Sequence, residues 1–154
     1  MRFLCDEMLA RLARLLRAAG YDTVLSQGGA SDDALVRQAG AERRIILTRD
    51  RELAALAGPK GLLVSGQGAM GEAHALTRAL SVDWALAPFT RCVMDNSDLR
   101  EAGPEEIARM PESAREGPGP FRVCPVCGRL YWPGSHTRRI RERLTALERS
   151  GGNP

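Results

Sequence analysis

The sequence predicts an α/β fold in which a parallel sheet is flanked by helices. Over residues 1–82, short apolar runs alternate four times with segments whose apolar residues recur at helical spacing. Strands that are joined through helices run parallel, and their connections are right-handed. The chain has 154 residues, of which 44% are hydrophobic, so it is long enough to bury a core.

The first unit is expected to place a strand at residues 2–5 and a helix at 7–20, which Gly20 ends. The second unit is expected to place a strand at 21–25 and a helix at 31–42. Ser31 is a good N-cap for that helix. The later units should contain strands at 44–48 and 61–65, and helices at 51–57 and 70–80.

The strand order 2-1-3-4 is predicted for this sheet, because it makes the first strand central and lets the chain change direction beside it. Asp6 ends the first strand, and Asp50 follows the third. Strands one and three are neighbours in this order. The two carboxylates should therefore lie side by side, at the edge where open α/β sheets place their chemistry.

A third acidic position follows the second strand, at Asp32 and Asp33. We favour Asp33, which starts the helix proper, although both are candidates. Each acid at a helix start also has a simple interpretation as an N-cap. Together, however, Asp6, Asp33 and Asp50 should share one edge, where carboxylates repel one another unless a cation binds them. Mg²⁺ or Mn²⁺ would suit such a site and would promote hydrolysis of a phosphate ester.

Arginines accompany these acids. Arg11 and Arg14 belong to the first predicted helix, and Arg49 and Arg51 flank Asp50. They either pair with the carboxylates or solvent, or hold the phosphates of a substrate, for which guanidinium geometry is well suited. The sequence does not place three further acidic residues, which are Asp22, Glu52 and Glu72.

Residues 83–150 are expected to form a smaller module, because proline and glycine become frequent and cysteines appear. Cys124-x-x-Cys127 followed by glycine is a knuckle typical of zinc sites. Cys92 adds a third thiolate. Three interpretations stay open: a zinc ion whose fourth ligand is Asp95 or His136, a metal-free knuckle held by packing, and a disulfide, which is least expected in the cytoplasm.

The end of the chain is basic, with seven arginines against two glutamates from Arg122 onward. A basic helix is expected at 138–149 and a disordered segment at 151–154. This charge favours a polyanionic partner, or else belongs to a solvated helix. Tyr131 and Trp132 either pack the knuckle onto the rest of the protein or stack on an unpaired base. In the second case the arginines that contact phosphates would be Arg129, Arg138 and Arg139.

Several of these segments together match one family. They are Phe3-Leu4-Cys5-Asp6-Glu7-Met8-Leu9 with Arg11-Leu12-Ala13-Arg14-Leu15-Leu16, Gly20-Tyr21-Asp22-Thr23, Asp32-Asp33, Ile46-Leu47-Thr48-Arg49-Asp50-Arg51-Glu52-Leu53, and Cys124-x-x-Cys127-Gly-Arg-Leu-Tyr-Trp-Pro-Gly-Ser-His136. Over nearly its whole length, the chain resembles the PIN-like ribonuclease domain first described at the C-terminus of the Mut-seven exonuclease.

This resemblance implies a PIN-like fold, Mg²⁺ or Mn²⁺ held by acidic residues, endonucleolytic cleavage of RNA, and a C-terminal zinc ribbon. Asp6, Asp33 and Asp50 fall on acidic positions of the family. Asp95 departs from it, because it stands where the zinc ribbon of the family has a cysteine.

We therefore expect a metal-dependent endoribonuclease that hydrolyses phosphodiester bonds of single-stranded or structured RNA. The alternative is a non-catalytic RNA-binding adaptor that uses the basic tail and the knuckle, with the acids serving as helix caps. A phospho-acceptor domain is disfavoured, because the only lysine is Lys60, within a Gly-Pro-Lys-Gly turn. No signal peptide or membrane span is recognisable, so a cytoplasmic location is expected. A homodimer is one oligomeric state that we consider.

Overall fold

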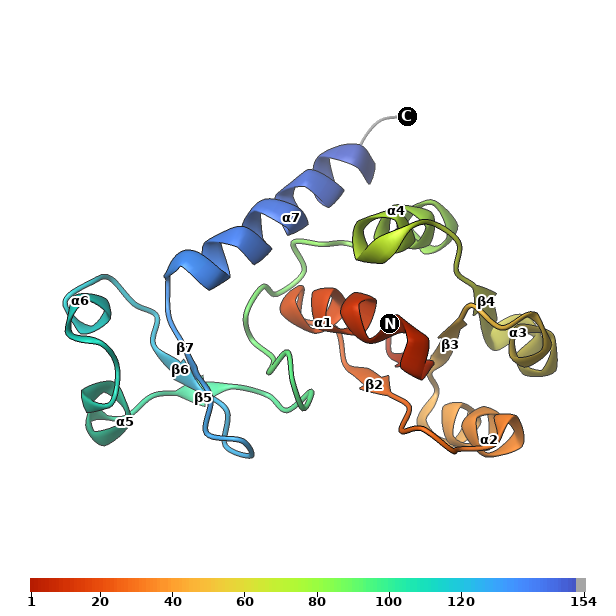
Figure 1. Cartoon of the computed structure of the whole chain (residues 1–154), viewed down its shortest axis with the longest axis horizontal. Coiled ribbons are helices and arrows are strands. Elements are labelled where there is room, and N and C mark those ends of the chain that lie inside the picture. The colour runs from red at the N-terminus through yellow and green to blue at the C-terminus, as the bar shows by residue number, and fades with distance from the viewer. Residues whose placement is uncertain (152–154) are drawn as a thin grey trace.

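A four-stranded parallel sheet in the order β2-β1-β3-β4 forms the centre of the fold (Figure 1). The computed structural model describes residues 1–151. Its sheet comprises β1 (Phe3–Cys5), β2 (Thr23–Leu25), β3 (Ile45–Thr48) and β4 (Gly61–Leu63). The predicted α/β class and strand order are confirmed. In the register, Phe3 pairs with Thr23 on one side and with Ile45 on the other, so β1 is central.

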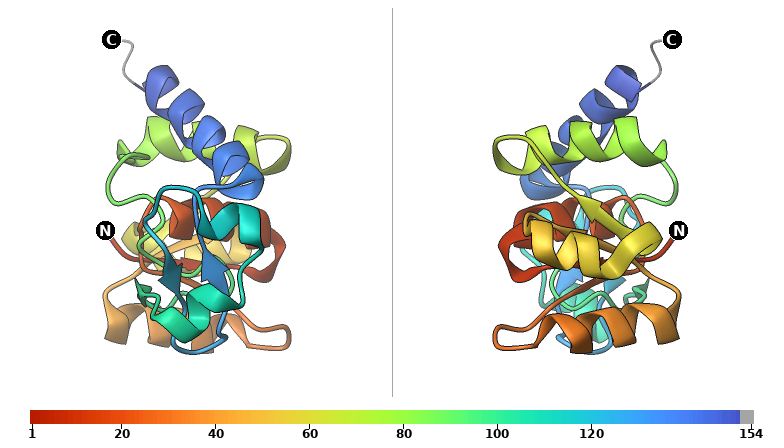
Figure 2. Two further views of the ribbon diagram at one scale, coloured as in Figure 1. Left: turned by 90° about the vertical axis from the view of Figure 1, so that its left-hand side faces the viewer. Right: turned by 90° about the vertical axis from the view of Figure 1, so that its right-hand side faces the viewer.

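Helices cover both faces of the sheet (Figure 2). The helices are α1 (Ala10–Ala18), α2 (Asp32–Glu42), α3 (Arg51–Ala57) and α4 (Gly68–Leu80), with the short 3-10 helices η1 (Glu7–Leu9) before α1 and η2 (Gly58–Lys60) after α3. Phe3 and Cys5 pack among apolar residues of α1 and α4, whereas Leu4 packs among those of α2 and α3. Successive strand residues point to opposite faces, so each face receives its own core.

Gly20 ends α1 in a backbone conformation that only glycine adopts readily. Its φ is +102°, and a Cβ at this position would lie 2.6 Å from the carbonyl oxygen of Ala87. The close approach lets the returning chain satisfy the end of α1, because Ala87 and Phe89 donate backbone hydrogen bonds to the carbonyls of Ala19 and Ala18. The chain after α4 is thereby fixed against the first helix.

A second, antiparallel sheet in the order β5-β6-β7 lies beside the first part of the chain (Figure 1). Its strands are β5 (Arg100–Glu101), β6 (Arg122–Val123) and β7 (Leu130–Tyr131). Along the chain, two short helices, α5 (Pro104–Ala108) and α6 (Glu112–Arg115), lie between β5 and β6. The turn between β6 and β7 carries Cys124 and Cys127, whereas the loop that carries Cys92 precedes β5.

The last helix, α7 (Ser135–Gly151), crosses α1 and α4 (Figure 1). It begins three residues before the predicted position, because Thr137 organises its first turn: the hydroxyl donates to the carbonyl of Trp132 and accepts the backbone N–H of Gly134, each at 2.8 Å. Leu144 and Leu147 of α7 belong to the core cluster that contains α1 and α4. Gly151, which was expected to begin a disordered segment, is instead the last residue of α7, and residues 152–154 of that segment lie outside the described residues. Within the described residues, no helix has the length and apolar character needed to cross a membrane.

Candidate functional site

Asp6 and Asp50 lie at the carboxyl ends of the neighbouring strands β1 and β3 and are joined through Thr48. The buried hydroxyl of Thr48 donates to Oδ2 of Asp6 at 3.0 Å and accepts the backbone N–H of Asp50 at 2.9 Å. The backbone N–H of Asp6 also donates to the carbonyl of Leu47 at 2.9 Å. Both acids therefore flank the crevice between β1 and β3, where the chain connections leave in opposite directions and open α/β sheets bind ligands.

Asp50 and Asp6 differ in whether their side chains cap a helix. Asp50 is the N-cap of α3, and its Oδ1 accepts the backbone N–H groups of Glu52 at 2.7 Å and Leu53 at 3.4 Å. Asp6 stands at the N-cap position of η1, but its side chain makes no capping hydrogen bond there. The capping interpretation therefore accounts for part of what Asp50 does and does not account for the carboxylate of Asp6.

Asp32 and Asp33 form the first turn of α2, and neither is its N-cap. Ser31 fills that position, with its Oγ accepting the backbone N–H of Ala34 at 3.3 Å. Asp32 is half-buried and Asp33 is exposed.

Asp6 and Asp50 follow the carboxyl ends of β1 and β3, whereas Asp33 lies in the first turn of the helix that follows β2, and the three acids do not form one compact cage. Within residues 1–151, the group of three or more potential metal ligands that lie within 4.8 Å of one another is found elsewhere, at the cysteines. The donor atoms at the edge nevertheless suit Mg²⁺ or Mn²⁺, which take carboxylate oxygens and usually keep several waters. Among the described hydrogen bonds, one oxygen each of Asp6 and Asp50 is engaged, and the second oxygen of each remains for a ligand.

Glu72 on α4 is an acid that the sequence could not place, and the structure puts it beside Arg49. Only 5% of Glu72 is exposed, and its Oε1 lies 3.8 Å from Nη1 of Arg49, which is about half exposed. A buried carboxylate requires a cationic or hydrogen-bonding partner, and this one finds it next to Asp50. Glu72 thus adds negative charge close to the part of the carboxyl edge that carries Asp6 and Asp50, here called the acidic edge.

The other three arginines predicted near the acids point to solvent. Arg11 and Arg14 are exposed on α1, and Arg51 is exposed at the first position of α3. Within the described part of the chain, none of the three makes a side-chain hydrogen bond or an ion pair. Their guanidinium groups are therefore accessible to an anionic ligand.

The Cys124-x-x-Cys127 segment forms a tight knuckle between β6 and β7. The backbone N–H of Cys124 donates to the carbonyl of Arg129 at 2.9 Å, and the N–H of Gly128 donates to the carbonyl of Cys124 at 3.0 Å. Gly128 has a φ of 71°. The N–H groups of Val126 and Cys127 approach Sγ of Cys124 at 3.4 Å each. Such N–H donors stabilise a thiolate, which is the form of cysteine that binds a metal.

The loop that begins at Cys92 repeats this geometry. The N–H of Cys92 donates to the carbonyl of Ser97 at 2.8 Å, and the N–H of Asn96 donates to the carbonyl of Cys92 at 3.0 Å. Asn96 has a φ of 73°, and asparagine is one of the few residues besides glycine that adopts this conformation readily. Asp95 therefore occupies, in its loop, the place that Cys127 occupies in the other.

The two loops bring Cys92, Asp95, Cys124 and Cys127, here called the cysteine cluster, to within 4.8 Å of one another. Sγ of Cys92 lies 3.7 Å from Sγ of Cys127. Tetrahedral zinc with Zn–S bonds of about 2.3 Å would separate two sulfurs by about 3.8 Å, so the residues fit that ion. His136 is exposed at the start of α7 and is not part of the cluster. All four cysteines of the chain are free thiols.

Electrostatics in the cysteine cluster favour a bound cation. Burial, together with the neighbouring Asp95 and thiols, raises the pKa of Cys127 to about 12. Burial also acts to raise the pKa of Cys92, but hydrogen bonds from Tyr131 and from the backbone outweigh it, and the pKa is lowered. A divalent cation would offset the repulsion among these groups and favour their thiolate forms.

Tyr131 contacts the cysteine cluster through its hydroxyl group. Its hydroxyl donates to Sγ of Cys92 at 3.2 Å and accepts the backbone N–H of Val93 at 3.1 Å, and only 9% of the residue is exposed. Tyr131 thus has the packing role that the sequence left open. Trp132, which is half-buried, keeps more of its surface accessible.

Arg17 ties the loop that carries Cys92 and Asp95 to the parallel sheet. This buried residue of α1 donates to the carbonyl of Thr23 at 2.8 Å and to the carbonyls of Val93 and Met94 at 3.1 and 2.8 Å. Burial lowers its pKa, although the acidic and thiol groups nearby act in the opposite direction. The loop between Cys92 and Asp95 is therefore anchored on the first helix.

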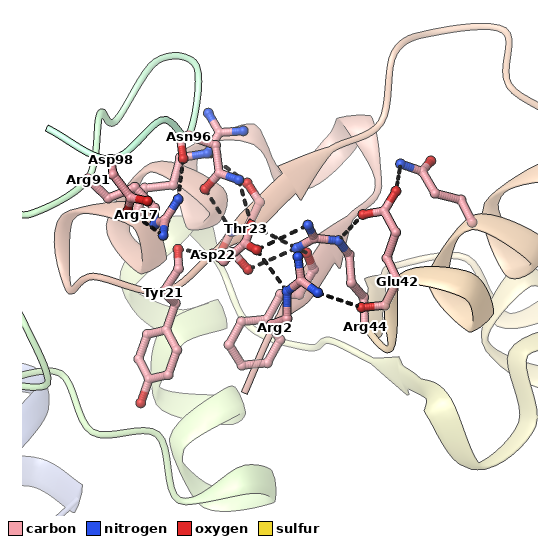
Figure 3. Close-up of polar contacts among 12 residues, drawn as sticks. Arg2, Arg17, Tyr21, Asp22, Thr23, Glu42, Arg44, Arg91, Asn96 and Asp98 are labelled. Atoms are coloured by element: carbon pink, nitrogen blue, oxygen red, sulfur yellow. Dashed lines mark hydrogen bonds and ion pairs between the residues drawn. The ribbon is translucent and has the colours of Figure 1, made fainter. Parts of the chain in front are cut away.

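A second anchor is built around Asp22, at the start of β2 (Figure 3). Its carboxylate accepts hydrogen bonds from Arg2 at 2.8 Å, from Arg44 at 2.8 and 3.2 Å, and from Nδ2 of Asn96 at 2.7 Å. Burial acts to raise the pKa of Asp22, but these donors outweigh it and lower the pKa. Asn96 thus connects the turn of the cysteine cluster directly to the sheet.

Comparison with known proteins now gives the family. A family model described as the Mut7-C RNAse domain matches residues 1–144. No curated protein and no solved structure gave a significant match. The segment matched by the family model includes the acidic edge, the cysteine cluster and most of α7. The chain belongs to the Mut7-C RNAse domain family.

Proposed function

We propose that this protein is a metal-dependent endoribonuclease with a PIN-like centre at the carboxyl edge of the sheet. The observation that carries the proposal is the pairing of Asp6 and Asp50 through Thr48 at the crevice between β1 and β3. Membership of an RNase family supports RNA as the substrate and a nuclease as the class of enzyme.

Each residue of the centre has an assigned role in this proposal. Asp6, Asp50 and Asp33 would hold Mg²⁺ or Mn²⁺, and the ion would supply activation of water and stabilisation of the charge that develops on the phosphate. Thr48 fixes the orientation of the Asp6 carboxylate. The guanidinium groups near this edge contact the phosphates of the strand, and these belong to Arg11, Arg14, Arg49 and Arg51.

A zinc ion is proposed at the cysteine cluster, where it would hold the two loops together. Cys92, Cys124 and Cys127 would supply thiolates and Asp95 a carboxylate. Free thiols in such a site suit a cytoplasmic location. The zinc module and the basic start of α7 would guide single-stranded or structured RNA toward the acidic edge.

The test compares cleavage of labelled single-stranded RNA by the parent protein and by Asp6→Asn, with and without added Mn²⁺. Both proteins are zinc-loaded, and metal-free buffer replaces a chelator so that the cysteine cluster is not stripped. The parent protein is expected to cut the RNA only when Mn²⁺ is added, and Asp6→Asn is expected not to cut it under either condition. Asp98→Asn is the matched control, because Asp98 is an exposed acid outside the edge. Equal cleavage by Asp6→Asn and the parent would refute the assignment.

The second candidate is a non-catalytic RNA-binding adaptor. The capping of α3 by Asp50 favours it, because that contact gives the acid a purely structural use. This candidate predicts salt-sensitive RNA binding in the same samples, with no strand scission under any metal condition.

A further inference from the structure

Three hollows lie around the first turns of α7 and share lining residues, and together they are here called the groove. The largest has a volume of about 320 Å³ and is lined by Phe89, Leu130, Trp132 and Ile140, among others. Two smaller hollows continue from it, and Thr137 lines all three. The volume of the largest is at the small end of ligand pockets, about 300–1,000 Å³, and suits one planar ring system.

The charge of this groove is of a single sign. Arginines line every part of it, and no aspartate or glutamate lines any of the three hollows. Arg129 borders the largest, whereas Arg122, Arg138 and Arg141 border the other two. The first residues of α7 also face the largest hollow, and the N-terminus of a helix favours anions. The groove therefore complements a ligand that carries negative charge on both sides of an apolar group.

Trp132 forms a fixed wall of the groove. Its ring lies against Gly134, where a Cβ would come within 2.9 Å of Nε1 of Trp132, so only glycine allows this packing. Thr137 binds the backbone of both residues. In the lining of the smallest hollow, the guanidinium of Arg141 lies 5.1 Å from the centre of the Phe89 ring. Such prior ordering reduces the entropy that a ligand would lose on binding.

We propose that the groove binds one unpaired nucleobase of an RNA strand, stacked on Trp132, with the flanking phosphates on Arg129 and on the Arg138–Arg141 pair. The identification of the ligand as RNA rests on the proposed function. The site itself is separate from the acidic edge and does not depend on catalysis. A paired base has its faces covered by its neighbours in the helix, so the groove selects single-stranded or bulged segments.

Binding is measured with the zinc-loaded Asp6→Asn protein and a short oligouridylate, so that cleavage does not interfere. Affinity is read from the anisotropy of a fluorescent label on the oligouridylate, which works equally for variants that lack Trp132. In the protein that keeps Trp132, stacking should also quench its fluorescence, whereas the buried Trp84 serves as an internal reference. Trp132→Ala should weaken binding about 5-fold to 150-fold, the range for one stacked base, and Trp132→Phe should restore most of it. An oligonucleotide with abasic positions should bind to the Asp6→Asn protein with intact Trp132 as weakly as oligouridylate binds to the same protein carrying Trp132→Ala.

Arg141→Ala should lower affinity and reduce the slope of log K against log salt by about 0.7, the value for one phosphate contact on a single strand. Arg149→Ala is the control, since it removes the same charge from the same helix outside the groove. Unchanged binding by both Trp132 variants, equal binding of duplex RNA, or displacement by polyglutamate as readily as by RNA would each overturn the proposal. Because the readout is binding, loss of this site and loss of nuclease activity are distinguishable.

Discussion

Replacing Asp22 with alanine should destabilise the zinc-loaded protein by about 3 kcal/mol, the lower end of the range for breaking a buried ion pair. The change removes the acceptor of four hydrogen bonds from Arg2, Arg44 and Asn96. Arg44 is 5% exposed and would lose one of its two carboxylate partners while it keeps Glu42. That remaining pair is why we expect the lower end of the range. The free energy of unfolding is measured by urea denaturation at neutral pH.

Asp98→Ala is the matched control for this measurement. Asp98 also pairs with an arginine, Arg91, at 2.6 Å, but its side chain is 81% exposed. Exposed ion pairs contribute about 1 kcal/mol or less. If both variants lose the same small amount of unfolding free energy, the partly buried Asp22 does not act as an anchor, and the reasoning from its hydrogen bonds is wrong.

Three further outcomes are expected. Because the folded-state pKa of Asp22 is lowered, the stabilisation from its carboxylate is present above the unfolded-state pKa of about 3.9 and is lost as the pH falls further. The difference in unfolding free energy between the parent and Asp22→Asn should therefore shrink below about pH 4, as measured by urea denaturation at a series of pH values. Tyr131→Phe removes the hydroxyl that donates to Cys92 and should lower zinc affinity about 10-fold to 100-fold in competition with a chelating dye. Thr48→Val leaves Asp6 without its hydrogen bond and should lower both cleavage, in the RNA assay, and stability, by about 1–3 kcal/mol in urea.

Much of the parallel sheet could be predicted, because its signals are local. Apolar runs alternate with helical periodicity, and residues 51–57 form a helix as expected. The order of the strands followed from the change of direction beside β1. The start of α7 was predicted three residues too late, since Pro133-Gly134 resembles an ordinary turn. The hydrogen bonds of Thr137 that begin the helix there are visible only in three dimensions.

The candidate site could be predicted where topology brings residues together, as with Asp6 and Asp50. A signal for the second loop of the cysteine cluster was also present, because Asp95-Asn96 parallels Cys127-Gly128: in each loop the fifth residue is of a type that adopts a left-handed conformation readily. Arg17 offered no such signal. Two of its three acceptors lie 76 and 77 residues away in the chain, and a basic residue within an amphipathic helix is usually expected to be solvated.

The position of α7 affects how the protein is made. Leu144 and Leu147 close the core over α1 and α4, and Arg17 gains two of its acceptors from residues 93 and 94. As the ribosome releases the parallel sheet, its first helix still has an uncovered apolar face and a buried arginine without those acceptors. Domains generally fold as units during synthesis, but here the unit is complete only after residue 147 has been translated. A truncated product that ends before α7 should therefore be retained by chaperones or degraded.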